Sequence, residues 1–158
     1  MKKELKIVRV QSEGSEFFER AVMLFDGYRQ FYKQASDVAR ARLFLADHIN
    51  NFESEIFLAL DEASNAIGFM QLYRGFSSVG MRKIYVLNDL YVVEESRGKG
   101  VGRFLIEEAK KFAAQNNVTK ITLTTAKTNR AAQSLYEAEG YVKDEDYLVY
   151  NLEVVKKF

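Results

Sequence analysis

A run of closely spaced glycines at residues 97–102, Arg-Gly-Lys-Gly-Val-Gly, most restricts how this chain can fold. The run follows an apolar, strand-like stretch from Leu87 to Val93 and precedes a stretch with the apolar spacing of a helix. Glycine adopts backbone conformations closed to other residues and lets a ligand approach the main chain closely. The helix that follows contributes unpaired N–H groups and the positive end of its dipole. These features predict a strand–loop–helix unit whose loop holds an anion, most naturally a pyrophosphate.

The spacing of the glycines separates this loop from the common nucleotide-binding loops. The glycines fall as G-x-G-x-G rather than G-x-G-x-x-G, and the chain contains no G-x-x-x-x-G-K-[ST] sequence. The pattern that does fit is R-x-x-G-x-G, formed by Arg97, Gly100 and Gly102. For the loop taken alone, a glycine-rich turn that serves only packing is the alternative.

Length and composition limit the classes of protein that this chain can belong to. Its 158 residues suit one domain with one core, so we expect residues 1–158 to form a single domain. The net charge of +1 shows no basic excess, and we therefore expect no nucleic-acid partner. The apolar runs are far shorter than the roughly 20 residues that span a bilayer, which predicts no membrane segment. Residues 1–4 lack the apolar stretch of a signal peptide, so a cytoplasmic location is expected.

The absence of cysteine excludes several kinds of chemistry at once. Disulfides, thiolate metal ligands and a cysteine nucleophile all require a residue that this chain does not contain. Its single histidine, His48, cannot form a histidine-rich metal site. We therefore expect no bound metal.

The order of the segments predicts a mixed α/β fold. Apolar periodicity indicates an antiparallel meander in the middle of the chain, with helices before it and a helix–strand–helix order after it. The first two helices are expected to take Ser15 or Ser12, and then Ser36, as N-caps. The expected strands are 5–10, 55–60, 66–76, 82–93, 120–125, 141–143 and 147–153, and the expected helices are 16–32, 37–50, 100–116 and 129–138, the last ending at Gly140.

A second motif lies at residues 129–141, Asn-Arg-Ala-Ala-Gln-Ser-Leu-Tyr-Glu-Ala-Glu-Gly-Tyr. Asn129 and Tyr136 are seven residues apart, which places both on one face of the expected helix. The small pair Ala131-Ala132 would let a ligand chain pass close to that helix. A core helix whose tyrosine packs its ring and bonds a carbonyl group is the alternative.

The R-x-x-G-x-G loop, the strand before it and the segment N-x-x-A-x-x-L-Y-x-x-x-G-[FY] resemble the GNAT family of N-acetyltransferases, over residues 87–141. The resemblance implies the GNAT acyl-CoA N-acyltransferase fold, a central, mostly antiparallel sheet flanked by about four helices. It implies acetyl-CoA as cosubstrate and direct transfer of the acetyl group to an amine. It also implies a bulge in strand 87–93, which splays away from the strand after the loop helix.

The same resemblance assigns the residues that would hold acetyl-CoA. The main chain of the splayed strand would contact the pantetheine arm, the loop amides would hold the pyrophosphate, and nearby cations would supplement them. The phenol of Tyr136 would protonate or hydrogen-bond the sulfur of coenzyme A, and a backbone N–H near Leu90 or Tyr91 would stabilise charge on the reacting oxygen. The cofactor-binding residues expected are Leu90, Tyr91, Val92, Arg97, Gly98, Lys99, Gly100, Val101, Gly102, Arg103 and Asn129.

The catalytic base is less closely defined. Asp89 is the first candidate because it lies on the strand beside the expected acetyl position. Polyamine-acetylating members of the family often carry Glu-Asp at this point, where this chain has Asn88-Asp89. Glu94, Glu95, a chain of water molecules or a carboxylate from the acidic run 144–146 stay open as alternatives.

The acceptor is expected to be a primary amine of a small molecule that resembles a polyamine or an amino acid. Tyr28 and Tyr32 are the expected substrate-binding residues, because aromatic and acidic groups suit an amine that arrives charged. A protein lysine or N-terminus is the alternative acceptor, and a non-catalytic sensor of acyl-CoA is the alternative function. The apolar stretch 148–155 could pair with a second subunit, which makes a homodimer possible, or could complete the chain's own sheet.

Overall fold

Five strands form one sheet in the order β1-β2-β3-β4-β5, in a computed structural model that describes residues 4–155. β1 to β4 are antiparallel to their neighbours, whereas β5 runs parallel to β4. The mixed α/β fold and the mostly antiparallel sheet are therefore confirmed. The strands are β1 (Lys6–Val10), β2 (Ser54–Leu60), β3 (Ala66–Ser77), β4 (Arg82–Val92) and β5 (Ile121–Thr122).

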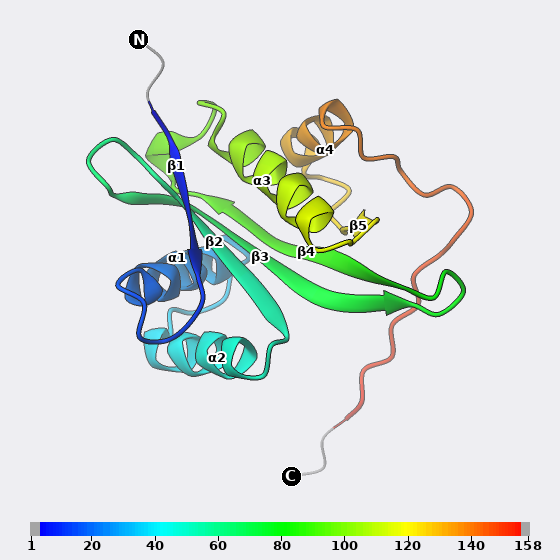
Figure 1. Cartoon of the computed structure of the whole chain (residues 1–158), viewed down its shortest axis with the longest axis horizontal. Helices are drawn as coiled ribbons and strands as arrows, with labels where there is room; N and C mark the ends of the chain where they lie inside the picture. Colours follow the sequence, from blue (N-terminus) through cyan, green and yellow to red (C-terminus); the bar gives the residue numbers. More distant parts are fainter. Residues whose placement is uncertain (1–3, 156–158) are drawn as a thin grey trace. The chain divides into compact units, whose positions relative to one another are not determined.

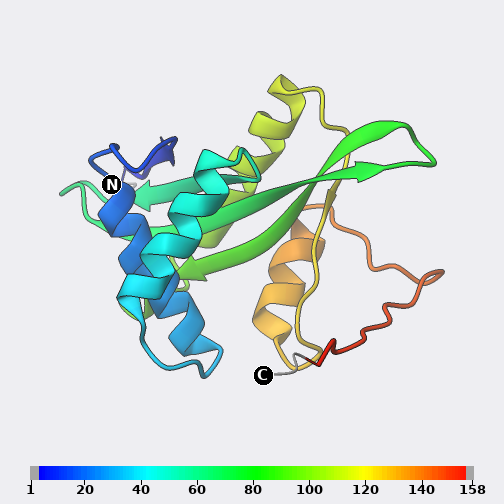
Figure 2. The ribbon, with the colours of Figure 1, turned by 90° about the horizontal axis from the view of Figure 1, so that it is seen from below.

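Helices cover both faces of this sheet (Figure 1). α1 (Phe18–Phe31) and α2 (Val38–Asn50) lie on one face, and α3 (Val101–Gln115) lies on the other, as Figure 2 also shows. The largest core cluster joins α1 and α2 to β2 and β3, because the inward side chains of both layers are apolar. A short 3-10 helix, η1 (Glu94–Ser96), connects β4 to the glycine loop.

The first two helices begin differently from the expectation. The residue before α1 is Phe17, whose N–H donates to the hydroxyl of Ser15 at 3.2 Å. The N-cap of α2 is Asp37, which accepts from the Arg40 N–H at 3.0 Å, so the expected Ser36 cap was wrong. Ser36 instead donates to the buried carboxylate of Asp26 at 2.6 Å, which leaves the next residue to cap the helix.

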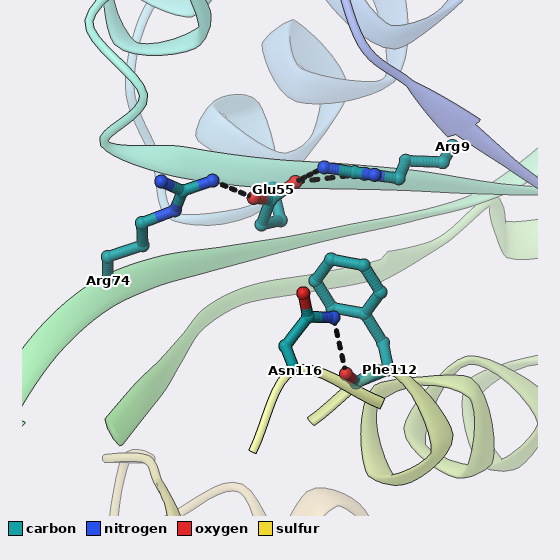
Figure 3. Close-up of polar contacts among 5 residues, drawn as sticks. All are labelled: Arg9, Glu55, Arg74, Phe112 and Asn116. Atoms are coloured by element: carbon teal, nitrogen blue, oxygen red, sulfur yellow. Dashed lines mark hydrogen bonds and ion pairs between the residues drawn. The ribbon is translucent and has the colours of Figure 1, made fainter. Parts of the chain in front are cut away.

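A buried carboxylate joins three strands on the α3 face of the sheet. Glu55 of β2 is only 4% exposed, and its carboxylate pairs with Arg9 of β1 at 2.6 Å and with Arg74 of β3. Figure 3 shows Glu55 between the two guanidinium groups. The Arg9 guanidinium also lies 4.8 Å from the ring centroid of Phe112 in α3, so the network ties the helix to the sheet.

The chain divides into two compact units, one ending at Thr125 and the other beginning at Ala126. The second unit contains α4 (Arg130–Ala138), which ends before Gly140 with the left-handed φ of 89° expected of it. The single domain over residues 1–158 stays a prediction. Within residues 4–155, no helix is both long and apolar enough to cross a membrane.

The strands expected at 141–143 and 147–153 were wrong, since residues 141–155 contain no strand. Alternating apolar side chains favour a strand, but a strand forms only where a neighbour completes its backbone hydrogen bonds. The strand expected at 120–125 is likewise reduced to two residues. The side chains of the C-terminal segment are instead 75–92% exposed, and they include Val142, Tyr147, Leu148, Val149, Tyr150, Leu152, Val154 and Val155.

Candidate active site

An irregularity in β4 determines which side chains reach the face under α1. Asp89 pairs with Gln71 of β3, whereas Leu87 pairs with Leu72, so Asn88 is an extra residue between two regular stretches. An extra residue in one strand is a β-bulge, and it reverses the side to which every later residue points. Tyr85, before the bulge, therefore stacks on Phe112 of α3, with ring centroids 5.7 Å apart.

After the bulge, the side chains of odd-numbered residues point toward α1 instead. A Cβ placed on Gly27 of α1 would lie 3.1 Å from the hydroxyl oxygen of Tyr91, so this ring packs directly on the helix backbone. Asp89 shares its face with Tyr91, because the two are separated by one residue of regular strand. The bulge thus places a carboxylate and a tyrosine under α1.

The edge of β4 beyond the bulge faces no strand within residues 4–125. Pairing with β5 ends at Val86 and Thr122, so the two strands separate before Asp89. Separation of these strands was expected from the resemblance, together with the bulge. It leaves main-chain groups of β4 available to a ligand.

Backbone direction identifies the main-chain groups that face this open edge. The N–H of Val93 donates to the carbonyl of Ile67 opposite it, at 3.0 Å. In an antiparallel pair such residues alternate with residues whose N–H and C=O point away from the partner strand. Leu90 and Val92 therefore present their main chain to the open edge, whereas the main chain of Tyr91 faces β3. The Val92 carbonyl accordingly accepts from Nε of Arg97 at 2.8 Å.

The carboxylate of Asp89 is almost fully enclosed, with 2% of the residue exposed. It accepts hydrogen bonds from the Gln71 side-chain amide and, at 2.9 Å, from Nδ2 of Asn88. The hydroxyl of Tyr28 interacts with the same carboxylate and also donates to the Asn88 carbonyl at 3.2 Å. Burial raises the pKa of Asp89 above its usual range, and these hydrogen bonds only partly oppose that effect. Such a carboxyl group suits general base catalysis.

Two residues of this site, Gln71 and Tyr73, were not found from the sequence. Both lie on β3, and Nε2 of Gln71 donates to the Tyr73 hydroxyl at 3.3 Å. Burial, followed by the charge of Asp89, raises the pKa of Tyr73 well above its usual range. The only sequence signal was a single amide within the otherwise apolar run Gly68 to Leu72.

Aromatic rings extend from the buried carboxylate to the surface at the end of α1. Tyr28 is half-buried and its ring lies 5.1 Å from that of Tyr32, which in turn lies 5.2 Å from Phe31. The guanidinium of Arg97 lies over the rings of Phe31 and Tyr91, at 5.2 and 5.7 Å. The two expected substrate-binding residues therefore lie together, and Tyr28 also contacts Asp89.

The glycine loop has the conformation that only glycine adopts readily. Gly98 and Gly100 have φ values of 73° and 83°, and a Cβ on either would meet nothing within 4 Å. Gly100 is the N-cap of α3 and has no side chain to bond the first N–H groups of the helix. Those N–H groups stay available to an anion, so the residues present fit the diphosphate of acetyl-CoA.

The three cations around the loop are each held within the chain. Arg97 bonds the Val92 carbonyl, and Nζ of Lys99 donates to the carbonyl of Glu95 at 2.6 Å. Arg103 pairs with Glu107 at 3.5 Å, one turn further along α3. The backbone amides therefore form the main anion-binding feature of this loop.

The second unit contains the other two predicted site residues. Asn129 is the N-cap of α4, and its side-chain oxygen accepts from the Ala132 N–H at 3.2 Å. Tyr136 is half-buried, with its ring 5.7 Å from that of Tyr141. Burial, followed by electrostatic interaction with Tyr136 and Glu139, raises the pKa of Tyr141 to about 12. In the acidic run, Asp144 accepts from the backbone N–H groups of Asp146 and Tyr147, as in a turn.

Glu94 and Glu95, the alternative bases beside the loop, are both exposed on η1. Among the described residues, no three acidic or histidine side chains are grouped so as to hold a metal ion.

A sheet that opens beside a bulge, next to a glycine loop at a helix N-terminus, fits the class of acyltransferases that use acyl-coenzyme A, as the resemblance implied. Residues 21–141 match the family model described as the acetyltransferase (GNAT) family. The chain belongs to this family. It is accordingly an N-acetyltransferase, and the family uses acetyl-CoA as its cosubstrate.

Known proteins similar to this chain support the same assignment. An uncharacterized N-acetyltransferase of Bacillus subtilis, YhfO, is 48% identical over 134 residues, which are 85% of this chain and 89% of the relative. The D-amino-acid N-acetyltransferase HPA3 of Saccharomyces cerevisiae is 38% identical over 88 residues, 55% of each chain. The crystal structure of a probable acetyltransferase, 34% identical, superposes with a TM-score of 0.87 and covers 96% of this chain and 99% of that one.

Proposed function

We propose that this enzyme transfers the acetyl group of acetyl-CoA to a primary amine of a small molecule that resembles an amino acid or a polyamine. The observation that carries the proposal is the buried carboxylate of Asp89. It has no ion-pair partner among residues 4–155, and it lies one residue before Leu90, whose N–H faces the open edge of β4. The similarity to a D-amino-acid N-acetyltransferase supports an acceptor of this size.

A base is needed because the acceptor arrives protonated. An alkylamine with a pKa near 10.4 is only about 0.04% neutral at pH 7, a deficit of about 4.6 kcal/mol. The raised pKa of Asp89 brings its basicity closer to neutral pH and makes it a stronger base than an exposed aspartate. The ammonium gives its proton to Asp89, and the freed lone pair forms the new N–C bond. The nitrogen then loses a second proton to solvent as the C–S bond breaks, which gives the amide.

The cosubstrate supplies a thioester, whose C–S bond breaks and whose electron pair leaves with sulfur. The N–H of Leu90 stabilises the negative charge that develops on the carbonyl oxygen. The amides of residues 98–102 hold the diphosphate. Tyr136 supplies the proton to the leaving sulfur and regains one from solvent, an assignment supported by its place in the family motif and by the O–H donor of its side chain.

Release of free thiol from acetyl-CoA tests the acceptor class directly. The rate should be measured with panels of polyamines, D- and L-amino acids and basic peptides. Turnover on small primary amines is expected. Turnover on peptides alone would overturn the proposed acceptor, and binding of acetyl-CoA without turnover of any amine would favour the sensor.

Single substitutions separate the proposed catalytic groups. Tyr136→Phe should lower kcat at least tenfold while the affinity for acetyl-CoA changes little, and an unchanged rate would remove Tyr136 from the mechanism. Glu94→Gln tests the alternative base, and its activity should stay within about threefold of the wild type. A large loss with Glu94→Gln would transfer the role of base away from Asp89.

We also propose that the enzyme forms a homodimer through its C-terminal segment. An exposed apolar run of this length is unusual for a monomer and typical of an interface. Light scattering on the full chain should give twice the monomer mass. The double variant Leu148→Glu, Tyr150→Glu should give the mass of one monomer. A monomeric wild type would contradict the proposal.

A further inference from the structure

One polar atom under α1 has no hydrogen-bond partner. Gln71 is fully buried in β3, and its Nε2 donates both to Asp89 and to the Tyr73 hydroxyl. Its other terminal atom, Oε1, accepts no hydrogen bond from any described residue. A buried acceptor without a donor is costly to a folded protein, and a functional ligand is one reason to keep it.

The orientation of this amide follows from the ionised carboxylate beside it. A carboxylate only accepts hydrogen bonds, so the NH2 end of Gln71 must face Asp89 and the oxygen end must point elsewhere. Asp89 thereby fixes the direction of Oε1. The pair therefore offers two buried acceptors, a carboxylate and an amide oxygen.

The groups around this pair do not balance its charge. Tyr28, Tyr73 and Asn88 are neutral, and no cation among residues 4–155 forms an ion pair with Asp89. A buried carboxylate is normally paired with a cation or bound to a metal. A positively charged group that donates hydrogen bonds is the partner that these two acceptors would suit.

We propose that Oε1 of Gln71 and the carboxylate of Asp89 together form the receptor for the primary ammonium group of the acceptor, so that Gln71 determines the preference for primary amines. This inference rests on the proposed function. One ammonium hydrogen bonds to Oε1, a second bonds to Asp89, and the nitrogen's third hydrogen carries no protein contact in this assignment. Gln71 and Asp89 are 0% and 2% exposed, so neighbouring side chains must move to admit the amine.

The arrangement also gives Gln71 a part in the proton transfer. The proton that passes from the ammonium to Asp89 leaves a neutral amine, which keeps its hydrogen bond to Oε1. The lone pair on nitrogen is then free while the nitrogen stays held. Nε2 meanwhile keeps the carboxylate in place and lowers the pKa of Asp89 by donating to it.

A secondary amine keeps fewer hydrogens for these contacts. Once its ammonium has given the proton to Asp89, a secondary amine has one N–H left and loses it on acetylation, whereas a primary amine retains one throughout. The receptor therefore favours the primary amine over its N-methyl derivative in the reacting complex. That preference is a property that a merely structural glutamine would not control.

Gln71→Met tests the inference, because methionine has a similar length and neither donates nor accepts strongly. For the best primary amine, KM should rise about tenfold or more, which is about 1.4 kcal/mol, while KM for acetyl-CoA stays within twofold. The preference for the primary amine over its N-methyl derivative should fall at least fivefold. The acid limb of the kcat/KM profile should move to higher pH, because Asp89 loses a donor.

Gln30→Met is the matched control. It makes the same substitution at a glutamine whose side chain donates to Asp26 rather than to Asp89, so KM for the amine and the preference for the primary amine should change less than threefold. Equal loss of rate with all amines in Gln71→Met, with KM and the acid limb unchanged, would make Gln71 structural and overturn the inference.

A measurement on the wild type covers the case in which Gln71→Met does not fold. In 15N-labelled protein, the side-chain NH2 signals of Gln71 should shift on saturation with the primary amine. Saturation without such a shift would overturn the inference. Failure of the proposed function is distinguishable, since the wild type would then release no thiol with any small amine.

Discussion

Replacing Asp89 with asparagine should lower the activity, and it should also remove a loss of stability that the wild type shows as the pH rises. The substitution removes the charge of a residue that is 2% exposed and keeps nearly the same volume. Loss of a general base costs about 10²- to 10⁴-fold in rate. We expect kcat/KM for the amine to fall by that factor at pH 7, while KM for acetyl-CoA stays within about threefold.

The same carboxylate should lower the stability of the wild type as the pH rises. Burial raises the folded-state pKa of Asp89 above its unfolded value, so its ionisation is harder in the folded protein. Its stabilising contribution is complete below an unfolded pKa of about 3.9 and is lost as the pH rises through the folded pKa. The free energy of unfolding of Asp89→Asn relative to the wild type should therefore increase between pH 4 and pH 7.

Urea unfolding at both pH values, together with thiol-release kinetics, checks both effects. The acid limb of the wild-type kcat/KM profile should disappear in Asp89→Asn. An activity within threefold of the wild type, or an acid limb that persists, would refute Asp89 as the base. A stability difference that is constant with pH would refute the argument from burial.

Three further predictions concern groups around the site. Asp26→Asn should lower the free energy of unfolding by about 2 kcal/mol at pH 7 with little change in kcat, because hydrogen bonds from Ser36, Asp37 and Gln30 outweigh burial and lower the pKa of this carboxyl. This loss of stability should shrink as the pH falls through the lowered pKa, and urea unfolding at pH 7 and pH 3 measures it. Gly68→Ala should lower the free energy of unfolding by about 1–3 kcal/mol and weaken acetyl-CoA binding, because the new Cβ would lie 2.9 Å from Val101 at the start of α3. Thermal unfolding and calorimetric titration measure the two effects, and an unchanged melting temperature would contradict the close packing. Gly100→Ala should raise KM for acetyl-CoA several-fold, because φ is 83° there, whereas Lys99→Ala should leave it within threefold; equal effects would point to the lysine charge rather than the backbone.

Regular periodicity predicted most of the fold from the sequence. The meander, the helix after the glycine loop and the helix with Tyr136 all have strong local patterns, and each lies within a few residues of its expected bounds. Gly140 was expected to end α4 because its backbone needs a positive φ, which is a local property. Such features depend on neighbouring residues alone.

The site was harder to predict because it depends on pairing between strands. Tyr85, Leu87, Asp89 and Tyr91 alternate along the sequence, and a regular strand would place all four on one face. The bulge separates the first two from the last two, and its position is set by the register with β3. Gln71 was missed for a similar reason, since its importance lies in the residue opposite it. The C-terminal strands were wrongly expected because periodicity shows what a strand could bury and not whether a neighbour exists.

The bulge at Asn88 sets both the side on which the Asp89 carboxylate lies and the direction of the Leu90 N–H, because backbone and side-chain directions alternate together along a strand. If Asn88 were paired as a regular strand residue, Asp89 would turn its carboxylate toward the α3 face and its own N–H toward the open edge. The bulged conformation at position 88 should therefore matter more than the identity of the residue. Asn88→Ala should keep kcat/KM within about tenfold and move the acid limb to higher pH, since Asp89 loses a donor. A loss of more than tenfold in thiol release by Asn88→Ala, with an unchanged circular dichroism spectrum, would show that the Asn88 side chain itself is needed.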